Sequence, residues 1–250
     1  MSVQVFGVDV GGSGVKGAPV DLTTGKLIGE RTRIPTPKPA TPDAVADAIV
    51  EIVESHGWSG PIGVTVPSVV LNGVVQTAAN IDPGWVDCDV ADLLAGRLGA
   101  PVTVLNDADA AGLAEVTYGA AKGAMGVVIL LTFGTGIGSA YLYRGQLIPN
   151  TELGHLIFKD QQAEHYAAGR LVKRGDLEID WWAQRVDELL DYIEDLFWPD
   201  LFVFGGGISK RFETYSHFFT TRAPIVPAVL RNQAGIVGAA LAASRGVDNG

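Results

Sequence analysis

The chain has 250 residues, of which 47% are apolar and 18% charged, and its formal net charge is −10. These proportions favour a globular fold over a disordered chain, and the negative net charge disfavours general nucleic-acid binding, which needs clustered Lys and Arg. The single cysteine, Cys88, excludes a disulfide framework and a cysteine-rich zinc site. We find neither a signal peptide nor an apolar run near the roughly 20 residues that span a bilayer, so we expect a cytoplasmic protein without a membrane partner.

The first predicted element is a glycine-turn hairpin. Val3–Val10 forms one apolar run, the chain turns at Gly11 and Gly12, and Val15–Val20 returns. After a short strand and the proline-rich loop 35–39, Thr41 is a helix N-cap with proline at the first helical position. The elements predicted next are a helix with an apolar stripe at Val45, Ile49, Ile52 and Val53, a strand Ile62–Val66, a helix Val90–Leu98, a strand Val102–Leu105 and a helix Asp107–Val116.

The second half repeats the opening pattern. Val127–Leu131 is an apolar strand, Thr132–Gly138 is a glycine-rich turn, and Ser139–Tyr143 is the returning strand. Two such hairpins about 120 residues apart indicate two related α/β domains, unless the likeness of two glycine turns is coincidental. The elements predicted next are helices Gln162–Lys173 and Asp180–Phe197, a strand Leu201–Phe204 that runs into Gly205-Gly206-Gly207, and a helix Ala234–Ala243.

We therefore expect an α/β protein with two lobes packed as one unit. The first lobe comprises residues 1–107, and the last helix, within 234–250, returns to it. The second lobe comprises residues 108–233. Ten of the 18 basic residues lie between Arg144 and Arg231, so the second lobe carries either a local basic track or evenly solvated charge.

The glycine turns are candidate phosphate sites. Glycine lets backbone N–H groups face an anion and lets phosphate approach without a clash with a β-carbon, although many hairpins need a glycine turn for other reasons. No Gly-Lys-Ser/Thr closes any of the turns, so none is a P-loop, and none has the dinucleotide spacing of a nicotinamide-dependent enzyme. The candidate phosphate-binding residues are Asp9, Gly11, Gly12, Ser13, Lys16, Thr132, Gly134, Thr135, Gly136, Gly206 and Gly207.

Two carboxylates at predicted strand ends are candidates for metal binding and for proton transfer. Asp9 either binds Mg²⁺, directly or through water, or caps its own turn. Asp107 opens a helix directly after a strand, at the edge where α/β proteins bind ligands. It is either a general base for an attacking hydroxyl or a helix N-cap. Asn106 would bond a neighbouring hydroxyl.

A second group of polar residues suits a sugar. Glu152, His155 and Glu164 follow the second hairpin, and such side chains bind adjacent hydroxyls in pairs. Asn80 would complete the polar pocket, with Trp85 either as its apolar wall or as part of the core.

These residues, in this order, resemble the ROK family of sugar kinases and sugar-responsive repressors. The resemblance covers almost the whole chain and implies an actin-like (ribonuclease H-like) two-lobed ATPase fold with a cleft between the lobes, and a homodimer. It implies Asp107 as the catalytic base and Asn80, Asn106, Asp107, Glu152, His155 and Glu164 as sugar ligands. It implies Asp9, Gly11, Gly12, Thr132, Gly134 and Thr135 as the phosphate and magnesium elements.

The chain departs from the family pattern in two places. Leu156–Ala163 is short and lacks the family's zinc-binding cysteines, so we expect no structural zinc. The family's Pro-Gly is Pro67-Ser68 here.

Three segments are most similar to the family's actinobacterial polyphosphate glucokinases: Ser13–Gly17, Leu131–Gly136 and Trp198–Leu201. This resemblance implies that glucose 6-phosphate is made with inorganic polyphosphate as donor and ATP as a possible second donor. The basic residues that we consider for a polyphosphate path are Lys122, Lys159, Lys173, Arg174, Lys210, Arg211 and Arg222.

Two alternatives remain. One is a strictly ATP-dependent glucokinase with Gly205-Gly206-Gly207 under the adenosine. The other is a non-catalytic sugar-binding protein, although only four residues precede Val5, which leaves no helix-turn-helix of the kind that family repressors carry. The sequence does not separate glucose from mannose or glucosamine as the acceptor.

Overall fold

The computed structural model describes residues 3–79 and 81–246, so the predicted sugar ligand Asn80 lies outside the described residues. The chain forms two compact units, one made of the residues up to Ala114 and from Asn232 onward, the other of Glu115–Arg231. The predicted lobes divide at residues 107 and 233, whereas the first unit boundary lies inside helix α3 (Asp107–Tyr118). The early part of α3 belongs to the first unit because Ala110 packs directly against Gly238 of the last helix.

The first unit is built on a six-stranded sheet of order β3-β2-β1-β5-β8, with β4 also paired to β2. Strands β1, β5 and β8 run parallel, and β1 and β2 form the predicted antiparallel glycine-turn hairpin. The strands are β1 (Gln4–Gly11), β2 (Gly14–Asp21), β3 (Lys26–Leu27), β4 (Thr32–Ile34), β5 (Ile62–Val66) and β8 (Val102–Asn106). A separate small hairpin consists of β6 (Val70–Leu71) and β7 (Val74–Val75).

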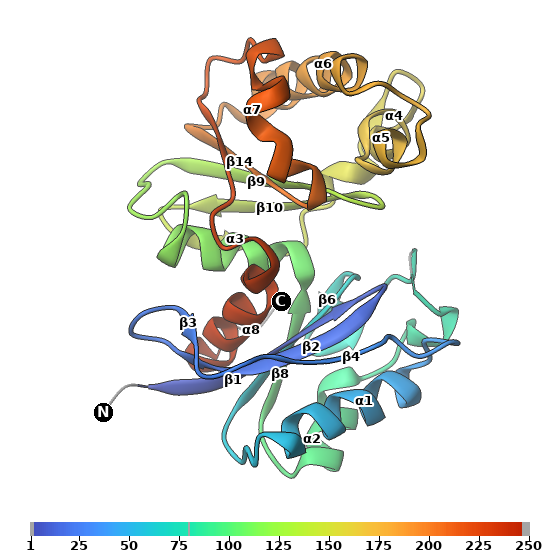
Figure 1. Ribbon diagram of the computed structural model, residues 1–250, viewed down its shortest axis with the longest axis vertical. Helices are drawn as coiled ribbons and strands as arrows, with labels where there is room; N and C mark the ends of the chain where they lie inside the picture. The colour runs from blue at the N-terminus through green and yellow to red at the C-terminus, as the bar shows by residue number, and fades with distance from the viewer. Residues whose placement is uncertain (1–2, 80, 247–250) are drawn as a thin grey trace. The chain divides into compact units, whose positions relative to one another are not determined.

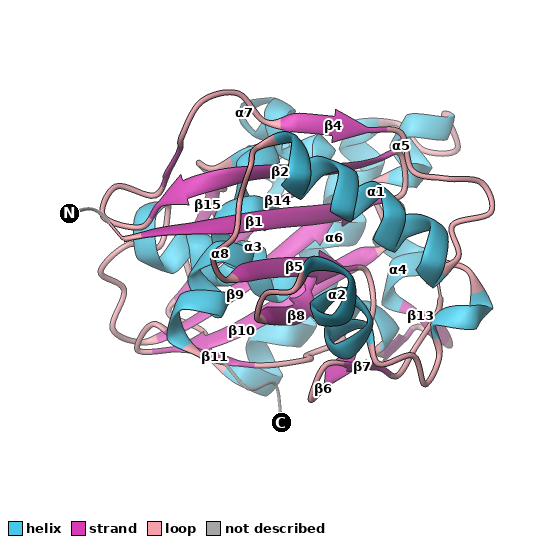
Figure 2. Cartoon of the chain, turned by 90° about the horizontal axis from the view of Figure 1, so that it is seen from below, coloured by secondary structure: helices cyan, strands magenta, loops and turns pink. Residues whose placement is uncertain are grey.

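Helices cover both faces of this sheet. Helices α1 (Pro42–Ser55) and α2 (Val90–Leu98) lie on one face and α8 (Ala234–Arg245) on the other (Figure 1). Seen from below, α1 and α2 lie over the strands (Figure 2). The Thr41 side chain accepts a hydrogen bond from the Ala44 N–H at 3.3 Å, which confirms the predicted N-cap of α1.

Successive side chains along β1 and β5 point to opposite faces of the sheet. Phe6, Val8 and Val10 are buried in the core that includes α1 and α2. Gly7 and Gly63 face α8, and a β-carbon on either would lie 1.9 Å from a carbonyl oxygen of that helix. Glycine at these two positions is therefore what allows α8 to pack so close to the sheet.

The second unit has a five-stranded sheet of order β11-β10-β9-β14-β15. Its strands are β9 (Val127–Phe133), β10 (Ile137–Tyr143), β11 (Gln146–Ile148), β14 (Leu201–Gly205) and β15 (Ile225–Pro227). The β9–β10 pair confirms the second predicted hairpin. Helix α6 (Ile179–Phe197) packs on the sheet, where the Trp182 ring meets the Phe133 ring edge-on at 5.4 Å.

One predicted helix is wrong. Residues 162–173 are not continuous but form two helices, α4 (Ala163–Ala167) and α5 (Arg170–Arg174), after the short hairpin of β12 (Ile157–Phe158) and β13 (Gln161–Gln162). The break occurs at Gly169, where a β-carbon would lie 2.8 Å from the Phe133 carbonyl oxygen. This close approach to β9 interrupts the helix. The remaining helix, α7 (Phe212–Tyr215), and strands β4, β6, β7, β12, β13 and β15 are too short to leave a sequence pattern.

Candidate active site

In the first unit the predicted catalytic and metal residues lie at the carboxyl edge of the parallel strands. The strand register aligns Asp9 of β1 with Thr65 of β5, and Thr65 with Leu105 of β8. With neighbouring strands about 4.8 Å apart, Asp9 and Leu105 lie roughly 10 Å from each other across the sheet. Asn106 and Asp107 follow directly, so this edge carries both predicted functional carboxylates.

Asp9 is held from three directions. Its Oδ2 accepts a hydrogen bond from Lys16 Nζ at 3.0 Å, and its Oδ1 accepts one from the Thr65 hydroxyl at 3.2 Å. On the third side, a β-carbon on Gly235 in the first turn of α8 would lie 2.9 Å from the Asp9 carboxyl. The positive end of the α8 dipole favours a negative charge at this point. These contacts connect Asp9 with strands β2 and β5 and with helix α8.

This arrangement suits Mg²⁺ bound mainly through water and phosphate. Mg²⁺ needs only one or two carboxylates when substrate phosphates supply the other oxygens, and Asp9 offers a partly exposed carboxylate beside a glycine turn. When bound, Mg²⁺ neutralises charge on the phosphates. Lys16 already neutralises part of the Asp9 charge, so the pair would have to open for direct coordination.

Asn106, not Asp107, caps helix α3. Its Oδ1 accepts hydrogen bonds from the backbone N–H groups of Ala108 at 2.8 Å and Asp109 at 3.1 Å, and its Nδ2 donates to the Ser68 carbonyl at 3.2 Å. The capping alternative for Asp107 was therefore wrong. Within residues 3–79 and 81–246, the buried Asn106 amide uses one of its two N–H groups, which leaves the other for a ligand. Asp107, as the first residue of α3, is partly exposed.

The first glycine turn has an open backbone on one side. A β-carbon on Gly12 would meet nothing within 4 Å, whereas one on Gly14 would collide with the Arg33 guanidinium at 2.6 Å. Arg33 lies opposite Lys16 in the β2–β4 pair and donates a hydrogen bond to the Ser13 carbonyl. The turn is thus fixed from the Arg33 side and accessible at Gly12, as an anion-binding backbone requires.

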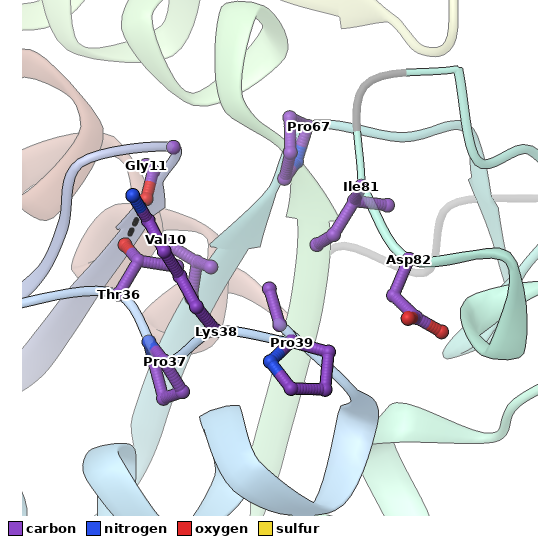
Figure 3. A pocket seen from close by; sticks show the side chains of 11 residues that line it. Val10, Gly11, Thr36, Pro37, Lys38, Pro39, Pro67, Ile81 and Asp82 are labelled. Carbon is purple, nitrogen blue, oxygen red and sulfur yellow. Dashed lines mark hydrogen bonds between the residues drawn. The ribbon is translucent and has the colours of Figure 1, made fainter.

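A pocket of about 300 Å³ adjoins this turn within the first unit (Figure 3). Gly11 and Gly12 line one end, and Ile81 and Asp82 line the other. The loop 36–40 forms the wall between them, where the Thr36 hydroxyl donates a hydrogen bond to the Gly11 carbonyl.

In the second unit the Glu164 carboxylate packs against the glycine turn. A β-carbon on Gly136 would lie 2.3 Å from Glu164 Oε2, so glycine there makes room for the carboxylate. Arg170 holds both partners, because its guanidinium donates to the Thr135 carbonyl and lies 3.8 Å from Glu164 Oε1. A β-carbon added at Gly134 would meet nothing within 4 Å, although the Gly134 N–H donates to the Gly136 carbonyl at 3.0 Å and its carbonyl accepts from the Arg170 N–H at 2.8 Å. Thr132 is in strand β9 rather than in the turn, and its hydroxyl lies 3.5 Å from the Gly138 carbonyl.

Glu152 directly precedes a short 3₁₀ turn, Leu153–His155, that packs on β10, and His155 is the last residue of this turn. A β-carbon on Gly154 would lie 2.1 Å from the Ile137 carbonyl, which fixes this turn beside the glycine loop. Glu152 Oε2 lies 3.8 Å from His155 Nδ1. Burial raises the pKa of the Glu152 carboxyl, His155 lowers it and the nearby Glu164 raises it. The second unit therefore gathers Glu152, His155 and Glu164 at one place.

In the third glycine run, Gly205-Gly206-Gly207, Gly206 is closely packed and Gly207 is not. Gly206 has φ +82°, and a β-carbon there would lie 2.4 Å from the Phe133 carbonyl, so this glycine serves the packing of β14 against β9. Gly207, which opens the 3₁₀ helix Gly207–Arg211, meets nothing within 4 Å. Of the two, only Gly207 offers an approachable backbone.

Sequence reasoning left two roles open for Trp85 and missed three other residues. Trp85 is core, with 1% of its surface exposed and its Nε1 donating to the Ala40 carbonyl at 2.7 Å. Arg33, Lys38 and Arg170 lie at the glycine turns but were not predicted there. The β4 pairing that sets Arg33 opposite Lys16 spans only three residues, too few for a periodic signal.

Comparison with known proteins agrees with this architecture. The ROK family model matches residues 5–170. The polyphosphate glucokinase of Mycobacterium tuberculosis is 54% identical over 238 residues, covering 95% of this chain and 90% of that protein. The polyphosphate glucokinase of Mycobacterium leprae is 50% identical over 243 residues, covering 97% of this chain and 75% of that protein.

Two solved structures show the same fold. The inorganic polyphosphate/ATP-glucomannokinase of Arthrobacter sp. strain KM superposes with a TM-score of 0.93 at 48% identity, covering 98% of this chain and 99% of that one. A ROK family glucokinase from Streptomyces griseus, in complex with glucose and AMPPNP, gives a TM-score of 0.84 at 25% identity, covering 97% of this chain and 100% of that one.

Within the part of the chain that the structure describes, no helix is both long and apolar enough to cross a membrane. The fold class predicted from the sequence, an actin-like α/β fold, is confirmed by the solved neighbours. Since the family model spans well over half of the residues, and a relative is 54% identical across nearly all of them, the chain belongs to the ROK family.

Proposed function

We propose that the protein is a polyphosphate glucokinase, which transfers the terminal phosphoryl group of inorganic polyphosphate to glucose and releases glucose 6-phosphate. The observation that carries the proposal is the 54% identity to a polyphosphate glucokinase over 95% of this chain. The family match, residues 5–170, also includes both hairpin glycine turns and the predicted acids of both units. A strictly ATP-dependent glucokinase has weaker support, since the Streptomyces coelicolor glucokinase is 28% identical.

The proposal assigns a role to each group of residues. Asp107 accepts the proton of the attacking sugar hydroxyl. Glu152, His155 and Glu164 bind the other sugar hydroxyls, together with the free Asn106 N–H and Asn80. The backbones at Gly12 and Gly134, with Ser13 and Lys16, receive the phosphate oxygens.

The supporting components of the reaction also belong to the proposal. Mg²⁺ would be held at Asp9 and by the phosphates, and ATP would serve as a second donor, as the name of the Arthrobacter enzyme suggests. The homodimer implied by the family resemblance and the cytoplasmic location remain predictions.

Initial rates with each donor test the proposal directly. Purified protein is supplied with glucose, Mg²⁺ and either long-chain polyphosphate or ATP, and glucose 6-phosphate is measured. We expect turnover with polyphosphate. Turnover with ATP alone would show a strictly ATP-dependent glucokinase, and sugar binding without turnover from either donor would show a non-catalytic sugar-binding protein.

Glu152→Gln should stabilise the protein and weaken its sugar binding. The raised pKa means that the folded protein binds a proton at Glu152 more tightly than the unfolded chain, so the ionised carboxylate destabilises the fold at neutral pH. The parent therefore gains stability from this group as the pH falls through the raised pKa, and the gain is complete below the ordinary value of 4.5. We expect a higher Tm for the variant at pH 7.5, with the difference shrinking toward pH 4.5.

The same variant should raise the KM for glucose about tenfold, because the charged acceptor becomes a neutral amide oxygen, which forms a weaker hydrogen bond. Glu213→Gln, which removes an exposed carboxylate from the same unit, is the matched control and should change neither quantity. An unchanged KM for glucose in Glu152→Gln would contradict a sugar-binding role for this residue.

A further inference from the structure

The Ser68 side chain carries a buried hydroxyl that no group in residues 3–79 and 81–246 hydrogen-bonds. Only 3% of the residue is exposed, and its Oγ is inaccessible to water. A buried hydroxyl whose donor and acceptor are both unused destabilises the folded protein, and native structures keep few such groups. The hydroxyl of Ser68 therefore calls for a partner that the protein itself does not supply.

Ser68 lies at the strand edge that carries the two predicted functional carboxylates. Strand β5 runs between β1 and β8 and ends at Val66, which pairs with Asn106. Two residues further on, the Ser68 carbonyl accepts a hydrogen bond from Asn106 Nδ2 at 3.2 Å. The unpartnered hydroxyl thus belongs to the residue that orients the amide of a proposed sugar ligand.

The backbone around Ser68 is fixed on both sides. Pro67 precedes it with a restricted φ. The Val69 N–H donates to the Thr77 hydroxyl at 3.0 Å, and the Val69 carbonyl accepts from the Gln76 N–H at 2.9 Å. Rotation about the Ser68 Cα–Cβ bond moves the hydroxyl among three staggered positions. A ligand beside Asn106 can therefore recruit the hydroxyl without a change in the backbone.

The pocket of the first unit reaches the same place. Its lining includes Pro67, directly before Ser68, and Ile81 and Asp82, which follow the predicted sugar ligand Asn80 in the chain (Figure 3). The pocket volume of about 300 Å³ is at the lower limit for small-molecule sites, about 300–1,000 Å³. This end of the pocket adjoins Ser68.

The surroundings of Ser68 suit a polyol better than an anion. The side chain bonded to Ser68, the Asn106 amide, is neutral. The next residue, Asp107, has a carboxylate, which disfavours a bound anion. A hydroxyl both donates and accepts, so a serine and a sugar hydroxyl can pair in either direction.

We propose that the Ser68 hydroxyl binds the hexose acceptor at the edge that carries its C3 and C4 hydroxyls. This inference rests on the proposed function and adds a sugar contact to those already assigned. The product is phosphorylated at C6, so Asp107 faces the C6 hydroxyl. Because C5 bears the ring oxygen and no hydroxyl, Asn106, the preceding residue, reaches the C4 hydroxyl first. Ser68, bonded to Asn106, lies next along the ring.

The contact makes Ser68 a specificity residue. The sugar-free protein carries the cost of an unsatisfied hydroxyl, and the sugar removes that cost, so the contact strengthens binding. A hexose that lacks the partner hydroxyl loses this gain. Mannose differs from glucose at C2, so Ser68 does not separate these two sugars.

Kinetics of Ser68→Ala with a set of sugars test the inference. At saturating polyphosphate, we expect the KM for glucose to rise about fivefold, as for the loss of one neutral hydrogen bond, with kcat and the KM for polyphosphate within twofold of the parent. Mannose and 2-deoxyglucose should show the same rise. With either 3-deoxyglucose or 4-deoxyglucose, the variant and the parent should have equal KM values, because that sugar lacks the hydroxyl that Ser68 binds. For a sugar that is not phosphorylated, its inhibition constant against glucose replaces the KM.

Thermal melting gives a second readout. Without sugar, Ser68→Ala should melt at or slightly above the parent, because the variant lacks the unsatisfied hydroxyl. A fixed concentration of glucose should raise the Tm of the parent more than that of the variant, since the stabilisation by a ligand depends on its Kd. A residue that only supports the fold would lower the Tm without sugar and leave the glucose-induced rise unchanged.

Ser59→Ala is the matched control. Ser59 is an exposed serine of the same unit that precedes β5, at the opposite end of the strand from Ser68, and its replacement should leave all these quantities at the parent level. Ser68→Gly, which recreates the Pro-Gly of the family, also lacks the hydroxyl and should show the same dependence on the sugar as Ser68→Ala.

Four results would overturn the inference. A loss shared by every sugar, 3-deoxyglucose and 4-deoxyglucose included, would mean that Ser68 shapes the site without binding a hydroxyl. A loss that disappears only with 2-deoxyglucose would place Ser68 at the other edge of the ring. An unchanged KM for glucose, or a rise confined to the KM for polyphosphate, would remove Ser68 from the acceptor. Failure of the parent protein to use polyphosphate would instead refute the proposed function, and the glucose-induced rise in Tm would still decide the role of Ser68.

Discussion

Replacement of Asp107 by asparagine should lower kcat about 1,000-fold, the scale of a lost general base. The amide has nearly the same shape as the carboxylate but cannot accept the proton of the attacking hydroxyl. Helix α3 should stay intact, because its N-cap is Asn106 rather than Asp107. Turnover is measured at saturating glucose and polyphosphate, and glucose binding is measured separately by calorimetry.

The control for this variant is Asp92→Asn. It also removes a carboxylate from the first turn of a helix, in α2, but on an exposed residue away from the strand ends. Its turnover should match that of the parent. If Asp107→Asn keeps more than a tenth of the parent kcat while binding glucose normally, Asp107 is not the base.

Replacement of Gly63 by alanine should lower the free energy of unfolding by about 3 kcal/mol, near the upper range for an overpacked core. The new β-carbon would lie 1.9 Å from the Ala239 carbonyl oxygen and 2.3 Å from its carbon, and both are backbone atoms of α8 that cannot rotate away. Helix α8 must therefore move off the sheet. For a chain of this length, the expected loss in Tm is about 6–12 °C by calorimetry.

Gly96→Ala is the opposite case. Gly96 lies in the exposed part of α2, with nothing within 4 Å of an added β-carbon, and alanine in a helix interior is favoured over glycine by about 0.5–1 kcal/mol. This variant should melt slightly above the parent. Equal melting temperatures for Gly63→Ala and the parent would mean that α8 does not rest against β5 as described.

The sequence predicted the helices and strands whose apolar residues follow a regular period over many positions. Both glycine-turn hairpins, the helix capped at Thr41 and the long helix over 180–197 were anticipated, because period-2 and period-3.6 patterns extend over enough residues in each. The break at Gly169 was not anticipated. Its cause is a contact with Phe133, which lies 36 positions earlier in the chain, and no local pattern records such a contact.

The same limit applies to the candidate site. Acids and glycines at strand ends were recognisable, because sheet topology brings strand ends together. Whether a glycine is open or packed was not recognisable: Gly12 and Gly134 are free of neighbours, while Gly136 makes room for Glu164. Buried Glu115 is a further case. It accepts hydrogen bonds from three backbone N–H groups, at Ala120, Val229 and Leu230, and only the fold reveals this.

The position of α8 in the chain has a consequence for biosynthesis. Residues 115–231 form one contiguous unit, so they can collapse as soon as they leave the ribosome. The β1–β5–β8 sheet is synthesised earlier, yet the face with Gly7 and Gly63 stays uncovered until the segment 234–245 emerges. The half of the protein made first is therefore the half completed last, and during translation its bare glycine-lined face is the surface that a chaperone would have to shield.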